Sequence, residues 1–489
     1  MKKIFKYTLT LLFLGGLGWS CTEDFLEVYP TEFLSAEQLE AASANNPDLL
    51  AGSLNGIYTL MFEAGTGGTD GHDDFGQKGY DIYGDMLCGD MALSVSTYGW
   101  YRTITQFQAT TDFTFQDNYQ VWRYYYRIVR SANLVIDASG GNDVVPELDE
   151  NKHILGQAKA LRAYAYFYLA QYFQEAYDPS EAILPIYTNP TDPNQPKSTA
   201  GEVYTLIEKD LTDAIGLLET FSRTQKNQVN KSVAQAFLAY TYAVTGEYGK
   251  AKDLTADIIN NGGYTLMSAE EVLGGFTDIN TPGWMWGHDV VLDNGLDLIS
   301  WWGQMDVYTY SYAWAGDYKA IDADLYAAIP ANDVRKRQFL NNPNSGRYLQ
   351  PINKFYDLDR VIGGQRNIET DYVYMRVAEM YLLHAETAAK SGDEGSAKTV
   401  LKRLLDERMD DTSFVDGLSG QALLNEIYFQ TRIELWGEGK SYLAMKRNKA
   451  MTKRGPNHYS NVGESISYDD DRMTFEIPQS EIQNNPFID

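Results

Sequence analysis

Apolar residues recur at helical spacing over long stretches of this 489-residue chain, and this pattern constrains the fold more than any other feature. In residues 153–176 and again in residues 202–219, they return every three or four positions, along one face of a helix. Loops rich in Pro, Gly, Asn and Asp separate such segments. Amphipathic helices must bury their apolar faces against one another, so we expect a mainly helical fold.

Two segments repeat one pattern of small residues around a glycine. "AYTYAVTGEYGKA" (239–251) and "AETAAKSGDEGSA" (385–397) share positions at the same offsets, with Gly246 and Gly392 in equivalent places. Small residues let paired helices approach, and a glycine permits the turn between them, as in tetratricopeptide-like repeats. Such hairpins are stabilised by stacking on each other, so we expect a scaffold of several helical hairpins.

The segment between the repeats, residues 264–371, differs from the helical part. It is rich in loop residues and aromatic residues, so we expect it to contain short β elements and to pack onto the scaffold. In "YTYSYAW" (308–314) aromatic and small residues alternate, which predicts a strand with all its aromatic rings on one face.

Exposed aromatic rings in this segment could bind sugars, because the C–H faces of a sugar ring dock on electron-rich aromatic faces. A second, smaller group of aromatic residues, "STYGWYR" (96–102), could lie across a cleft from the first. The alternative is that the rings form a satellite hydrophobic core. The candidate glycan-binding residues are Trp100, Tyr101, Trp284, Trp286, Trp301, Trp302, Tyr312 and Trp314.

Motifs for catalysis or for a resident metal are scarce. The five histidines do not form a metal-ligand spacing, and the glycine-rich residues 65–76 lack the Gly-Lys-Ser/Thr ending of a phosphate-binding loop. Asp70, His72, Asp73 and Asp74 within that stretch favour a solvated turn over a cation site. We therefore expect no catalytic residues, no metal and no cofactor. The formal net charge of −27 disfavours nucleic acid as a partner but does not hinder neutral ligands.

The first 20 residues read as an export signal. Three lysines precede a short apolar run from Tyr7 to Trp19, which is too short to span a bilayer. Cys21 follows it directly and is followed by acidic residues, an arrangement that favours cleavage and acylation of the cysteine. Lipidation of Cys21 would leave Cys88 as the one other cysteine, and we expect Cys88 to be a small buried residue.

The C-terminal third carries the most specific motifs, with charged residues at helical spacing that we expect to pair inside the helical core. These motifs are Arg376-Val-Ala-Glu379 with Ala385-Glu386, Arg432-Ile-Glu434-Leu435 with Glu438-Gly439-Lys440, Ile477-Pro478, Glu481-Ile482 and Asn485-Pro486. Near the N-terminus, "CTEDFLEVYPTE", Ser131-Ala132-Asn133 and Ala160-Leu161-Arg162 extend the set. In this order the motifs resemble those of the SusD/RagB family, the surface lipoproteins of glycan-degrading Gram-negative bacteria.

The resemblance spans nearly the whole mature chain and implies an architecture and a function. Residues 1–20 would be a lipoprotein signal peptide and residues 21–489 a single helical domain, with residues 264–371 as the aromatic-rich insertion and 372–489 as the C-terminal motif region. Acylated Cys21 would anchor the protein in the outer membrane, facing the exterior. There it would bind oligosaccharides or polysaccharides and deliver them to a SusC-like TonB-dependent transporter, without being an enzyme. The alternatives are the same fold binding peptides or another nutrient, and a surface glycoside hydrolase.

Overall fold

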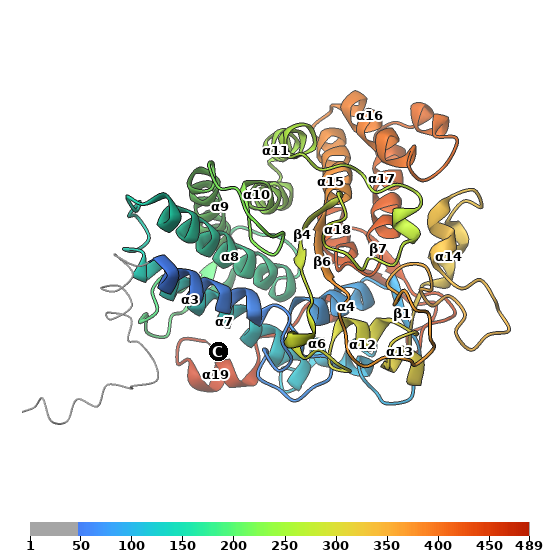
Figure 1. Cartoon of the computed structure of the whole chain (residues 1–489), viewed down its shortest axis with the longest axis horizontal. Coiled ribbons are helices and arrows are strands. Elements are labelled where there is room, and N and C mark those ends of the chain that lie inside the picture. Colours follow the sequence, from blue (N-terminus) through green and yellow to red (C-terminus); the bar gives the residue numbers. More distant parts are fainter. Residues whose placement is uncertain (1–46, 489) are drawn as a thin grey trace, which may run out of the picture.

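A computed structural model of the protein describes residues 47–488, so the predicted leader and Cys21 lie outside the described residues. Helices account for most of the ordered elements, as the periodicity predicts, and the strands are short (Figure 1). The longer helices are α3 (Pro47–Leu60), α4 (Gln77–Leu87), α7 (Gln116–Ala138), α8 (Asp149–Phe173), α9 (Ala200–Leu217), α10 (Lys231–Thr245), α11 (Tyr248–Asn261), α15 (Val377–Lys390), α16 (Glu394–Leu405) and α17 (Gly420–Glu434). The shorter ones are α5 (Arg102–Thr105), α6 (Gln108–Thr111), α12 (Trp301–Met305), α13 (Tyr312–Ala315), α14 (Ala323–Ala328), α18 (Ser441–Arg447) and α19 (Gln479–Asn484).

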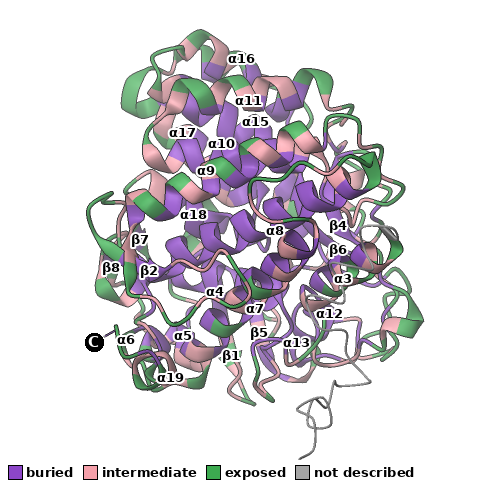
Figure 2. Ribbon diagram, turned by 90° about the vertical axis from the view of Figure 1, so that its left-hand side faces the viewer, coloured by how far each residue is buried: buried purple, intermediate pink, exposed green. Residues whose placement is uncertain are grey.

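Successive long helices pack side by side into a scaffold of hairpins. Helix α8 lies between α7 and α9, and α10 packs on both α9 and α11. Local signals fix the helix ends: at the start of α9, the Thr199 side chain accepts a hydrogen bond from the Glu202 backbone N–H, and the Glu202 carboxylate caps the Thr199 N–H in return. Figure 2 shows that α4 and α8 are buried over most of their length, whereas α9 and α16 have many exposed or partly exposed residues.

The two repeats form helical hairpins, which confirms the tetratricopeptide-like prediction. Gly246 separates α10 from α11 and has a φ of 86°, and Gly392 separates α15 from α16 with a φ of 88°. Both glycines adopt the left-handed conformation that disfavours other residues. Helix α11 packs directly on α15, so the hairpins stack although over a hundred residues separate them in sequence (Figure 1).

Four two-stranded antiparallel sheets complete the fold of residues 47–488. Their pairs are β1 (Met91–Ser96) with β5 (Asp317–Ile321), β2 (Ala182–Pro185) with β3 (Lys197–Thr199), β4 (Trp284–His288) with β6 (Tyr372–Arg376), and β7 (Met451–Lys453) with β8 (Ser465–Ser467). Two of these sheets join residues 264–371 to the rest of the protein, because β4 and β5 each pair with a strand from outside that segment. The predicted strand over residues 308–314 is wrong: this stretch is irregular and ends in α13.

Charged residues of the C-terminal motifs pair inside the core, as predicted. Glu434 accepts hydrogen bonds from Arg376, Arg408 and Arg335 at 2.9–3.2 Å. Arg376 also forms an ion pair with Glu438, from its Nε to Oε2 at 2.8 Å. Burial disfavours the ionised carboxylate, but the attraction of the arginines outweighs it and holds the pKa of Glu434 well below its ordinary value. These motifs therefore serve the scaffold. Cys88 is buried and free, also as predicted.

Candidate functional site

Pairing of β1 with β5 brings two loops to one edge of the protein, although they lie more than 200 residues apart in sequence. Ser96, the last residue of β1, lies opposite Asp317, the first residue of β5. The chain leaving β1 carries Tyr98 and Trp100, and the chain entering β5 carries Tyr312 on α13. This antiparallel register places two of the predicted binding residues, Trp100 and Tyr312, in one group of rings.

Four side chains form what we term the aromatic cluster: His72, Tyr98, Trp100 and Tyr312. The His72 imidazole is stacked on the Trp100 indole, with ring centroids 4.7 Å apart and planes inclined by 3°. Tyr312 meets Trp100 at 6.1 Å and Tyr98 at 5.4 Å, edge to face in both cases. Its hydroxyl lies 2.5 Å from the His72 Nδ1. Tyr98 is 59% exposed and Trp100 is half-buried, so these two rings offer the accessible surface.

Hydrogen bonds hold the loop that carries Tyr98 and Trp100. The Asp317 Oδ1 accepts from the backbone N–H groups of Thr97, at 2.6 Å, and Tyr98, at 2.8 Å. Gly316 has a φ of 121°, and a Cβ there would lie 2.5 Å from the Thr97 Oγ1, so only glycine lets the two loops approach this closely.

Two buried polar side chains, Gln304 and Lys319, form a series of hydrogen bonds that ends at the His72 backbone. Gln304 donates from Nε2 to the His72 carbonyl oxygen at 2.7 Å, and Lys319 donates from Nζ to the Gln304 Oε1 at 2.5 Å. Burial lowers the pKa of Lys319 to about 7 and lowers the pKa of His72 below its ordinary value. His72 is therefore neutral at pH 7, and its imidazole has one nitrogen that donates and one that accepts a hydrogen bond.

Five of the predicted binding residues belong to the core, and the prediction that they form an exposed platform is wrong. The five, Tyr101, Trp284, Trp286, Trp301 and Trp302, are each no more than 1% exposed. Trp286 packs among Tyr164, Phe237 and Tyr374, and the Trp302 Nε1 donates to the Thr370 carbonyl at 2.8 Å. Rings enclosed in this way cannot present a face to a sugar.

Trp314 lies on the same helical turn as Tyr312 but outside the aromatic cluster. It is 37% exposed and its ring contacts Tyr310, with centroids 5.6 Å apart. Gly363 covers part of this ring, because a Cβ on Gly363 would lie 2.5 Å from the indole. Trp314 thus adds a further accessible ring beside the cluster.

The sequence does not indicate His72 as a candidate glycan-binding residue, because its neighbours are acidic and glycine-rich, which favours a solvated turn. The structure buries Asp73 and Asp74 instead. The Asp74 carboxylate accepts hydrogen bonds from the backbone N–H groups of Gly67 and Thr69, which fold the loop back on itself. No local signal in the sequence places His72 against Trp100. Within residues 47–488, no group of three or more His, Cys, Asp or Glu side chains is arranged to hold a metal ion.

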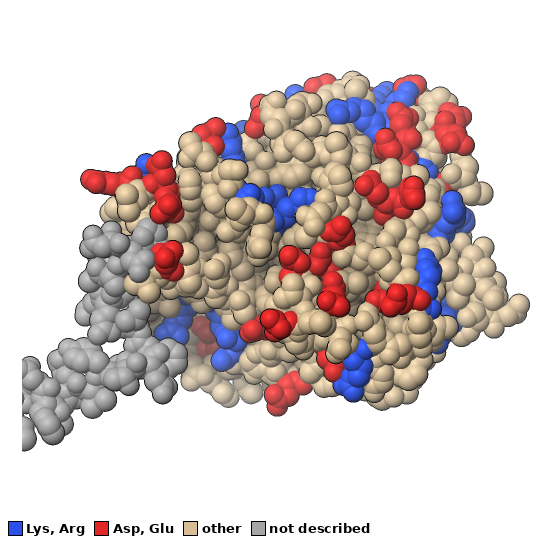
Figure 3. All heavy atoms as spheres, in the orientation of Figure 1, with Lys and Arg blue, Asp and Glu red and all other residues tan. Residues whose placement is uncertain are grey.

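The described surface is acidic overall but not uniformly so. On the face drawn in Figure 3, Asp and Glu side chains are interspersed with Lys and Arg among wide uncharged areas. None of the helices within residues 47–488 is long and apolar enough to cross a membrane.

Helical hairpins, a buried ion network and a group of accessible rings describe a helical-repeat protein with a candidate binding site, and comparisons with known proteins identify its family. Residues 74–243 match a SusD-like family model described as "Starch-binding associating with outer membrane", and residues 317–489 match that of the SusD family. The chain belongs to the SusD/RagB family.

Relatives and solved structures agree with this assignment. The chain is 26% identical to SusD-like protein P2 of Formosa agariphila over 92% of this chain and 91% of the relative. A SusD superfamily protein from Bacteroides thetaiotaomicron superposes with a TM-score of 0.75 at 25% identity, covering 91% of this chain and 99% of that one. A SusD-like carbohydrate binding protein from Bacteroides vulgatus has a TM-score of 0.72 at 24% identity, covering 90% and 97%. Members of this family are in general carbohydrate-binding proteins of nutrient uptake, associated with the outer membrane.

Proposed function

We propose that the protein is a cell-surface lipoprotein that captures oligosaccharides and delivers them to a SusC-like TonB-dependent transporter. The observation that carries the binding role is the aromatic cluster, where Tyr98 and Trp100 stay accessible while His72 and Tyr312 fix the Trp100 ring. Family membership supports the same role, as does the likeness to a solved carbohydrate binding protein.

The chemistry of the cluster suits reversible binding of a sugar. A pyranose can place its C–H face on Trp100 or Tyr98, and its hydroxyls can exchange hydrogen bonds with the Tyr98 hydroxyl and the His72 imidazole. Stacking and hydrogen bonding break no covalent bond, so the captured glycan would pass on unchanged. We therefore propose a binding protein and not an enzyme.

Calorimetric titration with neutral oligosaccharides and with short peptides tests the ligand class. We expect binding to at least one glycan and to no peptide. Long incubation with each bound polysaccharide, followed by detection of reducing ends, tests for hydrolysis, and we expect no increase. Peptide binding without glycan binding would instead favour the peptide-binding alternative, and new reducing ends would favour a glycoside hydrolase.

The membrane anchor proposed at Cys21 rests on the sequence, because this residue lies outside the described residues. Expression of Cys21→Ala in the native host should abolish labelling by a fatty-acid probe and release the protein from the membrane fraction or stall its processing. Unchanged labelling and membrane retention would contradict the proposal.

The transporter partner also rests on family membership. Affinity purification of the native lipoprotein in mild detergent should recover an outer-membrane transporter, with crosslinking before lysis as an independent check. A receptor that purifies alone under several gentle conditions, and that yields no transporter crosslink, would count against the partnership.

A further inference from the structure

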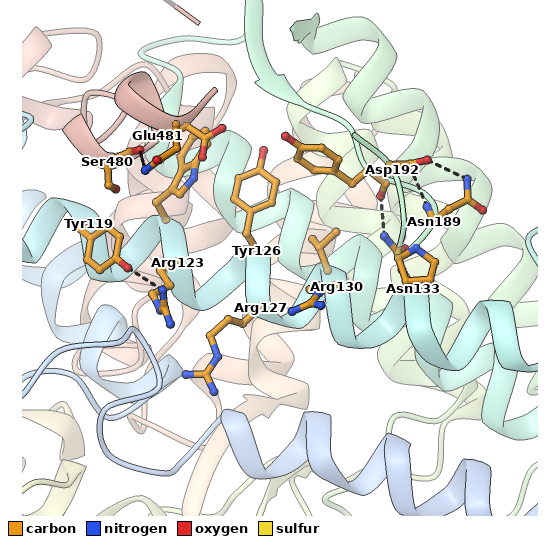
Figure 4. Close-up of a pocket in the computed structure, with 15 residues that line it drawn as sticks. Tyr119, Arg123, Tyr126, Arg127, Arg130, Asn133, Asn189, Asp192, Ser480 and Glu481 are labelled. Carbon is orange, nitrogen blue, oxygen red and sulfur yellow. Dashed lines mark hydrogen bonds between the residues drawn. The ribbon is translucent and has the colours of Figure 1, made fainter. Parts of the chain in front are cut away.

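A groove of about 540 Å³ lies outside the aromatic cluster, although Arg127 on its wall donates to Thr66 in the loop that also carries His72. Helix α7, the loop that follows β2 and helix α19 form its walls (Figure 4). Helices α7 and α19 lie on the left of Figure 1, and α13 with β1 lies on the right. The groove shares no lining residue with the cluster, and its volume lies within the range of small-molecule sites.

Three arginines of α7 line the groove: Arg123, Arg127 and Arg130. Their spacing of four and then three residues places them on one helical face, about 10 Å from first to last along the axis. Arg123 donates to the Tyr119 hydroxyl at 2.7 Å, and Arg127 donates to the Thr66 carbonyl at 2.6 Å. Within the described part of the chain, Arg130 has no hydrogen bond or ion pair, and none of the three contacts a carboxylate.

The two acidic residues of the groove are engaged elsewhere. The Asp192 carboxylate accepts hydrogen bonds from the backbone N–H groups of Thr188 and Asn189, at 2.8 and 2.9 Å, and so closes its own turn. The Glu481 Oε1 accepts from the Asn485 side chain at 2.9 Å. The three arginines that line the groove therefore carry a charge that its own acids do not pair, in a chain of net charge −27.

Aromatic rings stand beside these charges. Tyr126 and Tyr187 meet at 5.9 Å with their planes inclined by 77°, and both are half-buried. The Trp122 ring packs on the Tyr126 ring, with centroids 4.6 Å apart, and restrains its position. The groove thus combines ring faces, which suit the C–H face of a sugar, with planar guanidinium forks, which bind carboxylate or sulfate oxygens in pairs.

We propose that this groove is a second saccharide site, selective for anionic sugars that carry a carboxylate or a sulfate ester. Its location and its charge selectivity come from the arginines, whereas the choice of a saccharide as ligand rests on the proposed glycan-receptor function. A carboxylate and a sulfate present the same fork of oxygens to a guanidinium group. Neighbouring anionic sugars of one oligosaccharide could therefore bind successive arginines along α7.

Matched ligand pairs test the proposal by calorimetric titration of the purified protein. Oligogalacturonate is compared with its methyl ester, and a sulfated galactan oligosaccharide with its desulfated form, so that the members of each pair share one sugar backbone and differ at the anionic group. We expect the charged member to bind and the neutral member to bind at least about tenfold more weakly at this site. Added salt should weaken the charged ligand, because screening acts on the guanidinium–anion contacts. The charged ligand that binds, oligogalacturonate or the sulfated galactan, shows whether the groove selects a carboxylate or a sulfate ester.

Variants assign that binding to the groove. Arg130→Gln, which removes no hydrogen bond or ion pair between described residues, should lower affinity for the charged ligand about tenfold, and addition of Arg127→Gln should lower it further. Arg337→Gln is the control for loss of an exposed arginine outside the groove and should bind like the parent. Melting temperatures of all variants are compared to exclude misfolding.

Several results would overturn the inference. Equal affinity for charged and neutral ligands would do so, and so would unchanged binding in the double variant. Tighter binding of an acidic peptide than of either charged saccharide would assign the groove to a protein segment. If Trp100→Ala abolishes acidic-glycan binding and the arginine variants do not, the groove inference fails while the proposed function stands. Arginine-dependent binding of charged glycans, with no binding of neutral glycans, would support the groove as a saccharide site. The same result would contradict the proposed role of the aromatic cluster.

Discussion

The Asp317 carboxylate accepts a hydrogen bond from the backbone N–H of Tyr98, its Oδ1 lying 2.8 Å from the nitrogen. The same oxygen accepts from Thr97 at 2.6 Å, so one buried carboxylate at the start of β5 fixes the loop that presents Tyr98 and Trp100. Asp317 does not need to touch a ligand to affect binding. Its effect would pass through the position of the loop.

Asp317→Ala should therefore weaken glycan binding and also destabilise the fold. The Tyr98 N–H loses its acceptor, which costs about 1–3 kcal/mol for a buried group. The Thr97 N–H loses one of two acceptors, because it also donates to the Gly316 carbonyl at 3.1 Å. Asp317→Asn keeps one side-chain oxygen as an acceptor and should restore most of both losses. Titration with the best-bound glycan, together with thermal melting, separates the two variants. Parental glycan affinity in Asp317→Ala, measured well below its melting temperature, would show that the loop does not depend on this contact.

Trp100→Ala should lose glycan binding while melting close to the parent. By analogy with bases on aromatic platforms, loss of one stacking ring costs about 1–3 kcal/mol of binding free energy. Trp302→Ala is the matched control, since it removes an indole that is fully buried. That change should cost about 3–5 kcal/mol of folding stability and leave the affinity of the remaining folded protein unchanged. The reverse outcome, with binding lost in Trp302→Ala alone, would return the site to the buried aromatic residues.

Five tryptophans between residues 284 and 314 suggest a binding platform, but ring count does not reveal burial. Trp284 and Trp286 occupy β4, whose pairing with β6 closes them into the core. The site itself depends on pairing between β1 and β5, which brings residues more than 200 positions apart into contact. Neither pairing has a local sequence signal.

Scaffold features are readable in the sequence because they are local. Helical periodicity predicts α8 and α9, and the glycines at equivalent offsets predict the two hairpins. Charged residues at helical spacing on apolar segments predict the buried pairs, since an isolated charge cannot stay in a core. His72 has no such signal, because its role depends on a tertiary stack with Trp100.

Glu434→Gln should be strongly destabilising. Three arginines, Arg335, Arg376 and Arg408, share this buried carboxylate, and neutralising it leaves their charges undercompensated in the core. Breaking a buried ion pair from one side costs about 3–5 kcal/mol. The control is Asp416→Asn, which removes an exposed partner of Lys402 and should change stability by less than about 1 kcal/mol. Similar free energies of unfolding for the two variants, from denaturant titration, would contradict the central role of Glu434.

Gly246→Ala and Gly392→Ala should each destabilise the fold by about 1–2 kcal/mol, because both positions have the left-handed backbone conformation. Neither glycine has an atom within 4 Å of an added Cβ, so the cost is conformational and not steric. Gly249→Ala is the matched control inside α11, also with open space around the added methyl group. It should stabilise the helix by about 0.5–1 kcal/mol. The same sign of change at Gly246 and Gly249 in denaturant unfolding would rule out this account of the hairpin turns.

Acid should remove a defined part of the stability through Glu386. Burial opposes ionisation of this carboxyl, but the attraction of Arg447, at 3.0 Å, and of Lys390, at 2.8 Å, outweighs it and lowers the pKa to about 2. In the unfolded chain the pKa is about 4.3. Because the folded pKa is the lower one, this contribution is fully present above about pH 4.3. It is lost at about 1.4 kcal/mol per pH unit as the pH falls toward 2.

Glu386→Gln isolates that contribution, since glutamine resembles the protonated acid in shape and in lack of charge. At pH 7 the variant should be less stable than the parent by roughly 3 kcal/mol, the free energy that corresponds to the lowered pKa. Below about pH 4.3 the two free energies of unfolding should converge, because the parent then becomes protonated on unfolding. Urea unfolding of both proteins at a series of pH values, down to the lowest pH at which the parent remains folded, measures the difference. A difference that stays constant across the series would mean that Glu386 stabilises the protein by its shape and hydrogen bonds and not by its charge.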